Sequence, residues 1–191
     1  IATECAAVFP ELPFEATHVV EASIPLSDDV SLIGAVSANA NEFRSMLLSQ
    51  EGVVLFDAIR RGDEIEVKRA IPPIDPIGFG RHMTGDVQLV LIHPPGNPSE
   101  VGLTQEGSKT CRWSRRGAAG QEVVEVELGA SHSAQVRRYE NGTLARAALL
   151  TAIDERGYAH DALLKTTGII GYQLHLTLLS SESAAQSDED R

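Results

Sequence analysis

Histidine is the side chain best suited to metal binding and proton transfer at neutral pH, and six histidines are spread over this chain of 191 residues. No HExxH motif and no cysteine-rich spacing places them in a zinc-binding arrangement. The pair His82-Met83 has the ligand types of a copper site, but the chain has only two methionines, which favours a surface histidine beside a core methionine. We therefore expect no metal site. The six are His18, His82, His93, His132, His160 and His175.

Other residues with catalytic potential lack the partners that a reaction needs. No G-x-S-x-G motif is present, and the segment GFGRHMTG (78–85) lacks the Lys-Ser/Thr ending of a phosphate-binding loop. Cys111 lies beside Arg112, which favours a thiolate, but its place in a predicted strand indicates a packed or disulfide-bonded cysteine. Paired acids such as Glu64 and Glu66 lie on the solvent side of their strand. The sequence therefore predicts a protein without catalysis and without a cofactor.

The two cysteines, Cys5 and Cys111, leave three interpretations open. They are two unrelated thiols, or they form a disulfide bond in an exported protein. In the third interpretation Cys5 is the acylated cysteine of a lipoprotein, although Glu4 before it fits the cleavage site of such a protein poorly. The chain begins at Ile1 rather than Met, which is consistent with a removed leader segment.

Charge and composition exclude several classes of protein. With 27 acidic and 16 basic residues the net charge is −11, so phosphate backbones repel the chain and nucleic-acid binding is not expected. The length fits one domain with a sizeable core. No apolar run reaches the ~18 residues of a membrane-spanning helix. Residues 181–191 contain several acids and no apolar period, which predicts a disordered acidic tail.

Most of the chain alternates apolar and polar residues, as is typical of antiparallel strands. Asn141-Gly142 supplies the positive φ angles of a type I′ hairpin turn. We expect an irregular lead-in at residues 1–14, a single domain at 15–180 and about eleven strands, although the alanines of 144–153 also allow a helix there. The expected strands are 15–24, 29–38, 42–50, 52–60, 63–70, 109–114, 121–128, 133–140, 144–153, 160–167 and 171–180.

One segment between two groups of prolines does not fit this pattern. Its apolar residues recur at helical spacing, which predicts a helix near 78–91, although the β-branched residues of 87–92 also allow a buried strand. Three glycines weaken this helix by roughly 1 kcal/mol each relative to alanine, so it must be held by what it covers. A helix over the concave face of a curved sheet gives a half-barrel with a lid; alternatively the helix completes a solid core. The apolar stripe is Phe79, Met83, Val87, Val90 and Leu91.

This order of elements resembles the bacterial LolA and LolB group, and more closely envelope lipoproteins related to LolB. The resemblance covers most of the chain and rests on GVVLFDAIRRGDEIEVKRAIPP (52–73), RHMTGDVQLVLIHP (81–94) and GYQLHLTLL (171–179). It implies an incomplete antiparallel β-barrel whose hydrophobic cavity is covered by helices. In that family the cavity receives acyl chains of lipoproteins or other lipids, which are carried across the periplasm or accepted at the outer membrane. The receptor's membrane-directed loop and the carrier's lid arginine have no assignable match here.

We therefore expect a mainly β protein with a helical insertion, in which an antiparallel, incomplete β-barrel under a helical lid binds lipid, lipoprotein acyl chains or another apolar ligand. It would act without catalysis, as a monomer, in the periplasm or at the periplasmic face of the outer membrane, with an envelope transport protein as a partner. A structural or protein-interaction module of the envelope with a filled core is the alternative, and a small-molecule enzyme is the third interpretation. The expected cavity residues are Val54, Phe56, Phe79, Met83, Val87, Leu174, Leu176 and Leu178.

Overall fold

The computed structural model describes residues 1–23, 28–72, 74–117, 120–167 and 171–183. Along the chain many strands alternate buried and more exposed side chains, as their period-2 pattern predicts. Over the described residues the elements are α1 (Ala2–Ala6), β1 (Phe14–Ser23), β2 (Val30–Ala38), β3 (Phe43–Leu48), β4 (Val54–Arg61), β5 (Glu64–Ala70), α2 (Pro76–Leu91), β6 (Glu100–Leu103), β7 (Lys109–Gly117), β8 (Gly120–Leu128), β9 (Ala134–Glu140), β10 (Thr143–Ile153), β11 (Ala159–Thr166) and β12 (Gln173–Ser183).

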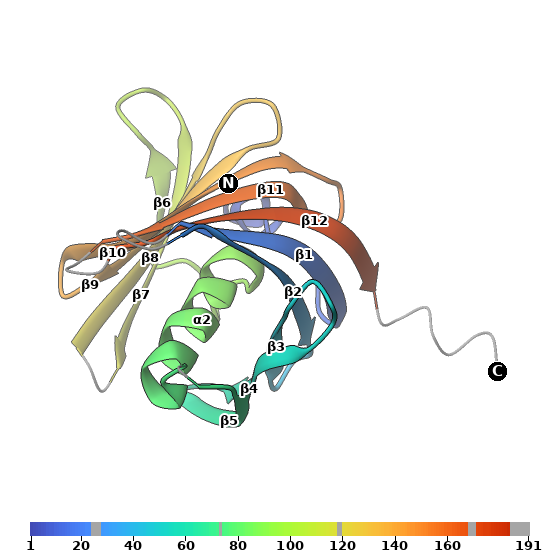
Figure 1. The fold of residues 1–191 in the computed structure, drawn as a ribbon. Coiled ribbons are helices and arrows are strands. Elements are labelled where there is room, and N and C mark those ends of the chain that lie inside the picture. Colours follow the sequence, from blue (N-terminus) through green and yellow to red (C-terminus); the bar gives the residue numbers. More distant parts are fainter. Residues whose placement is uncertain (24–27, 73, 118–119, 168–170, 184–191) are drawn as a thin grey trace.

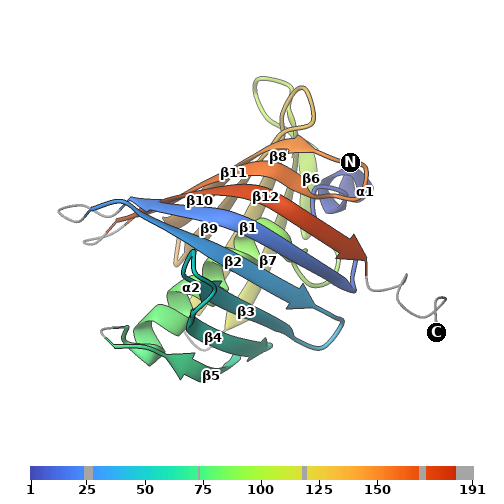
Figure 2. The same ribbon diagram turned by 45° about the vertical axis from the view of Figure 1, so that its right-hand side comes forward.

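These twelve strands form one antiparallel sheet. Its order is β5-β4-β3-β2-β1-β12-β11-β10-β9-β8-β7-β6, so consecutive strands pair except at β5 and β6, which remain the two edges. The first and last strands, β1 and β12, pair with each other in the middle of the sheet. The sheet curves around α2 and stays open between its edges (Figures 1 and 2). The predicted fold class, an incomplete antiparallel barrel with a helical insertion, is confirmed.

The structure decides the two segments for which the sequence allowed both helix and strand. Residues 144–153 belong to β10, because strand alternation buries Ala148 and Leu150 in the core. Residues 87–91 end helix α2, and Ile92 has extended backbone angles. The hairpin turn is confirmed, since Asn141 and Gly142 have φ angles of 50° and 80°.

Other boundaries differ from those predicted. Strand β6 was missed because its four residues pair only with β7 and show no alternation of buried side chains. The lead-in is not wholly irregular, since it contains α1 and the start of β1 at Phe14. Ser181–Ser183, assigned to the acidic tail, form the end of β12 because they pair with Phe14–Ala16. The rest of the predicted tail lies outside the described residues.

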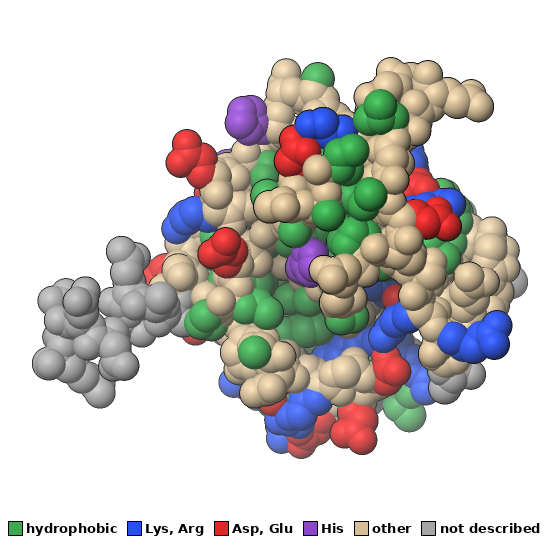
Figure 3. Space-filling model, turned by 180° about the vertical axis from the view of Figure 1, so that it is seen from behind, with side chains coloured by type: hydrophobic (Ala, Val, Ile, Leu, Met, Phe, Trp, Pro, Cys, Tyr) green, Lys and Arg blue, Asp and Glu red, His purple; other side chains and the backbone are tan. Residues whose placement is uncertain are grey.

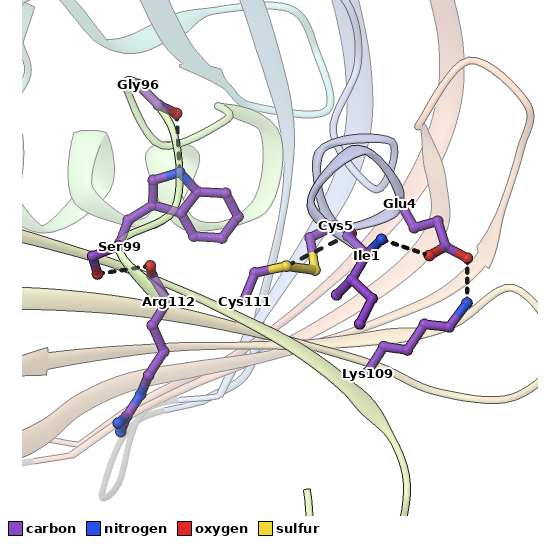
Figure 4. The surroundings of a disulfide bond; sticks show 9 residues. Ile1, Glu4, Cys5, Gly96, Ser99, Lys109, Cys111 and Arg112 are labelled. Atoms are coloured by element: carbon purple, nitrogen blue, oxygen red, sulfur yellow. Dashed lines mark hydrogen bonds and ion pairs between the residues drawn. A yellow bond between two sulfur atoms is a disulfide. The ribbon is translucent and has the colours of Figure 1, made fainter. Parts of the chain in front are cut away.

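Helix α1 is held by tertiary contacts, because a helix of five residues is unstable in isolation. Its Cys5 forms a disulfide bond with Cys111 of β7, and both cysteines are buried. Glu4 pairs with Lys109 of β7 and with the amino group of Ile1 (Figure 4). The disulfide leaves no thiol at Cys5 for acylation. Of the three interpretations of the two cysteines, the structure therefore agrees with the disulfide bond.

Helix α2 joins the two edge strands and lies across the concave face of the sheet (Figure 1). The Asp75 carboxylate caps it by accepting hydrogen bonds from the backbone N–H of Ile77 and Gly78, at 3.3 and 2.8 Å. At Gly80 a Cβ would lie 3.2 Å from Val67 of β5, so the glycine permits the helix to approach the sheet closely. Gly80, one of the three glycines that weaken the isolated helix, therefore serves its packing.

Two faces of α2 are buried, whereas the sequence predicted one apolar stripe. Phe79 and Met83 of that stripe pack against β4 and β5. Thr84 and Asp86, which lie off the stripe, are also buried. The helix contacts strands of both halves of the sheet, β3–β5 and β9–β11. The lid is therefore held by polar as well as apolar contacts.

Buried His18 on β1 is expected to make stability depend on pH. Its side chain is 3 % exposed, and burial lowers its pKa to about 4 from the usual 6.5. Between these two pH values the unfolded chain binds a proton at His18 that the folded chain does not. The free energy of unfolding is therefore unaffected by His18 above pH 6.5 and falls as the pH decreases below it. Between pH 7 and pH 4 we expect His18 to account for a loss of about 3 kcal/mol in the free energy of unfolding.

Urea unfolding at the two pH values checks this expectation in the wild type and in His18→Leu. The variant should lose less stability than the wild type on acidification. His160→Leu is the matched control, because His160 is an exposed histidine of β11. Equal acid sensitivity of the wild type and His18→Leu would contradict the prediction.

Candidate ligand-binding site

A cleft of about 460 Å³ lies between the two halves of the sheet. Residues of β3 and β4 line it on one side, and residues of β7, β8 and β9 line it on the other. The last turn of α2 and residues 92–95, which follow it, lie between them. The face of the molecule opposite to Figure 1 has hydrophobic side chains gathered around a hollow, with Lys and Arg side chains beside it (Figure 3).

One part of the cleft is apolar and aromatic. The indole N–H of Trp113 donates a hydrogen bond to the carbonyl oxygen of Gly96 at 3.1 Å, so the ring presents only apolar atoms to the cleft. The His93 ring packs edge-to-face against Trp113 at 5.5 Å and against Phe9 at 5.9 Å. Partial burial lowers the pKa of His93, which favours its neutral form. The buried apolar lining residues are Phe43, Leu89, Pro94, Trp113 and Val124.

The other part of the cleft contains the arginines Arg60, Arg115 and Arg138. Arg115 donates two hydrogen bonds of 3.2 Å to the carboxylate of Glu122. Arg60 lies 3.7 Å from Asp63, whereas Arg138 comes only within 4.0 Å of Glu122. Burial and the neighbouring arginines lower the pKa of Arg60 and Arg138, although a guanidinium remains charged at neutral pH. This part of the cleft is positive in a chain whose net charge is −11.

Strand register brings these arginines together. On β9 the alternation that buries Val136 also turns Arg138 inward, and on β10 it turns Arg146 inward beside Ala148. Arg138 and Arg146 face each other directly across the two strands. Like charges directly opposite on one face of a sheet are destabilising, so each needs a compensating group.

Arg146 has such a group in helix α2. Its Nε donates a hydrogen bond of 2.8 Å to Asp86, and its Nη2 lies 3.1 Å from Nδ1 of His82. The Tyr172 hydroxyl donates to the second oxygen of Asp86, and the burial of this phenol raises its pKa. This network of Asp86, His82, Arg146 and Tyr172 attaches α2 to the second half of the sheet.

The eight residues expected to line the cavity lie elsewhere. Phe56, Phe79 and Met83 share one cluster with Leu174 and Leu176, and the Phe56 and Phe79 rings pack edge-to-face at 4.9 Å. None of the eight lines the cleft, because the space between helix and sheet is filled by their own side chains. Their role as ligand contacts stays a prediction, which requires α2 to move. Val87 and Leu178 pack against the main core with Leu174 and Leu176, and Val54 is in neither described cluster.

The residues that line the cleft were not predicted, although the amino-acid sequence contains one signal for them. In three strands an arginine follows a buried residue at i+2 and so points to the same face: Arg60 after Ala58, Arg115 after Trp113, and Arg138 after Val136. An inward arginine breaks the rule that the core face is apolar, and such breaks mark functional positions. No comparable signal singles out Leu89 of α2.

Comparison with known proteins assigns the fold. By sequence, no family model matches the chain and no curated protein does. By structure, it is similar to a LolA superfamily protein from Nitrosomonas europaea, with a TM-score of 0.63 and 11% identity over 95% of this chain and 93% of that chain. It is also similar to a domain from Vibrio parahaemolyticus described as an outer membrane lipoprotein-sorting protein, with a TM-score of 0.43 and 8% identity over 98% of this chain and 92% of that one. The first similarity confirms the LolA-like fold that the resemblance implied.

Two further features are absent from the described residues. In the described parts of the chain, no helix is both long and apolar enough to span a membrane. Among the same residues, no group of three or more His, Cys, Asp or Glu side chains is arranged to hold a metal ion.

Proposed function

We propose that the protein is a non-catalytic carrier of the bacterial envelope, which binds a lipid, a lipoprotein acyl chain or another apolar group in the cleft. The cleft carries this proposal: its volume of about 460 Å³ lies within the ~300–1,000 Å³ of typical ligand sites, and its buried lining is mostly apolar. Each CH₂ group that leaves water for such a site contributes about 0.8 kcal/mol to binding. No covalent chemistry is needed.

The location and partner in this proposal follow from the fold and the disulfide. A bond between Cys5 and Cys111 persists in an oxidising compartment, which supports the periplasm or the periplasmic face of the outer membrane. The LolA-like fold supports transport or outer-membrane insertion of lipidated cargo. An envelope transport protein would deliver or receive the ligand, and the protein itself would act as a monomer.

Trp113 provides a direct test, because it is the one tryptophan of the chain and lines the cleft. A brominated fatty acid quenches tryptophan fluorescence on contact. We expect saturable quenching of Trp113, and roughly tenfold weaker binding, about 1.4 kcal/mol, when Ile92→Arg places a charge in the cleft. Ile77→Arg is the matched control, because Ile77 lies on α2 outside the cleft and is 69 % exposed.

The filled interior beneath α2 favours a second candidate, a structural or protein-interaction module of the envelope without a ligand. The same titration separates the two functions. Quenching that does not saturate, together with native mass spectra that show no bound lipid, would support the module and contradict the carrier.

A further inference from the structure

The polar part of the cleft contains a buried arginine whose nearest acid, Glu122, is distant and shared with another arginine. Arg138 of β9 is 7 % exposed, and its Nε has no hydrogen-bond partner among the residues that the structure describes. The carboxylate of Glu122 lies 4.0 Å away and is already bound by Arg115. The Nη2 group of Arg138 donates one long hydrogen bond, of 3.5 Å, to Gln88. A buried guanidinium with so few acceptors needs a further anionic partner.

The surrounding charges do not supply that partner. Arg146, directly opposite on β10, repels Arg138 and forms ion pairs with both Asp86 and Glu140. The remaining carboxylate of the cleft lining, Glu42, accepts a hydrogen bond of 2.6 Å from Arg61. The lining therefore has an excess of positive charge next to an apolar surface.

We propose that Arg138, together with Arg60 and Arg115, binds the anionic group of an amphipathic ligand, either a carboxylate or a phosphate. A guanidinium donates paired hydrogen bonds to both groups, and the three arginines line one cleft from three strands. The apolar side chains beside them would take the alkyl chain of the same molecule. The ligand class is thus an acidic lipid, a specification that rests on the proposed carrier function.

Two brominated probes of equal chain length, a fatty acid and its methyl ester, test this site through the quenching of Trp113. The wild type should bind the acid more tightly than the ester. Replacement of Arg138 by Met should weaken binding of the acid roughly 10- to 100-fold and leave binding of the ester unchanged, because only the acid uses the charge. Higher ionic strength should weaken binding of the acid and leave binding of the ester unchanged.

The neighbouring residue supplies the matched control. Arg137 points to the opposite face of β9, where it donates hydrogen bonds to Glu125 and Glu127. Arg137→Met should bind the acid as the wild type does, whereas Arg138→Lys should retain part of the preference for the acid. Arg115→Met, a change at a more exposed position, should also reduce that preference.

The outcomes distinguish the two proposals. Equal affinity of the wild type for acid and ester would overturn the anionic site and leave the carrier function intact. Absence of quenching by either probe would overturn both. An equal loss of acid and ester binding in Arg138→Met would also overturn the anionic site. Competition by millimolar inorganic phosphate would support the site and assign it to a free phosphate; competition only by an alkyl phosphate would assign it to a lipid headgroup.

Discussion

Replacement of Cys5 and Cys111 by alanine should lower the free energy of unfolding by about 5 kcal/mol, because their bond closes a loop between residues 106 positions apart. The bond lowers the conformational entropy of the unfolded chain, and this effect on stability is large because the closed loop is long. Alanine is preferable to serine, since both positions are buried and burial of a hydroxyl would add a cost of its own. Urea unfolding of the oxidised wild type and of the double variant measures the difference.

The wild type with and without reductant provides the control for this experiment. Reduction should shift the unfolding midpoint of the wild type towards that of the double variant and leave the variant unchanged. An unfolding midpoint that is the same in all four samples would contradict the prediction. The result also bears on the cleft, because Cys111 and Trp113 are neighbours on the inward face of β7.

The Asp86→Ala substitution should cost about 3–5 kcal/mol of stability, because it removes the buried counter-ion of the Arg146 guanidinium and leaves only the more exposed Glu140, at 3.5 Å. The hydroxyl of Tyr172 loses its acceptor as well. A double-mutant cycle with Arg146→Met, followed by urea unfolding, measures the coupling. The double variant should be less destabilised than the sum of the two single variants, since it removes both charges.

Glu66→Ala is the matched control, because Glu66 forms its ion pairs with Arg61 and Lys68 on the exposed face of β5. Such exposed pairs contribute little to stability. If Asp86→Ala destabilises the protein no more than Glu66→Ala does, the network does not hold α2 to the sheet. A strong effect would show that release of the helix requires separation of a buried ion pair.

The strands were predictable because their signal is local. A period of two in apolar residues, together with turn residues such as Asn141-Gly142, specifies antiparallel strands joined by short connections. The helix near 78–91 was predictable for the same reason, since its spacing and the flanking prolines differ from those of a strand. Short α1 and β6 carry too few residues for a period, so contacts from the rest of the molecule decide their conformation.

The candidate site was less predictable. The sequence indicated that apolar surface lies between a helix and a curved sheet, and it suggested Phe56, Phe79 and Met83 as lining residues. In the folded protein these side chains pack against each other, and the cleft lies beside Trp113 and Arg138. Whether space remains between two apolar faces depends on the volumes of side chains from many strands, which no single segment specifies.

Local patterning in the amino-acid order was sufficient for the strands, the helix and their antiparallel arrangement, because each follows from the nearest few residues. The pairing of β1 with β12, the burial of both faces of α2 and the opposition of Arg138 to Arg146 arise only on closure of the sheet. These contacts join residues up to 169 positions apart, as for Phe14 and Ser183. Their charges and volumes become coupled only in the folded state, and that coupling produces the cleft and its incompletely paired arginine, Arg138.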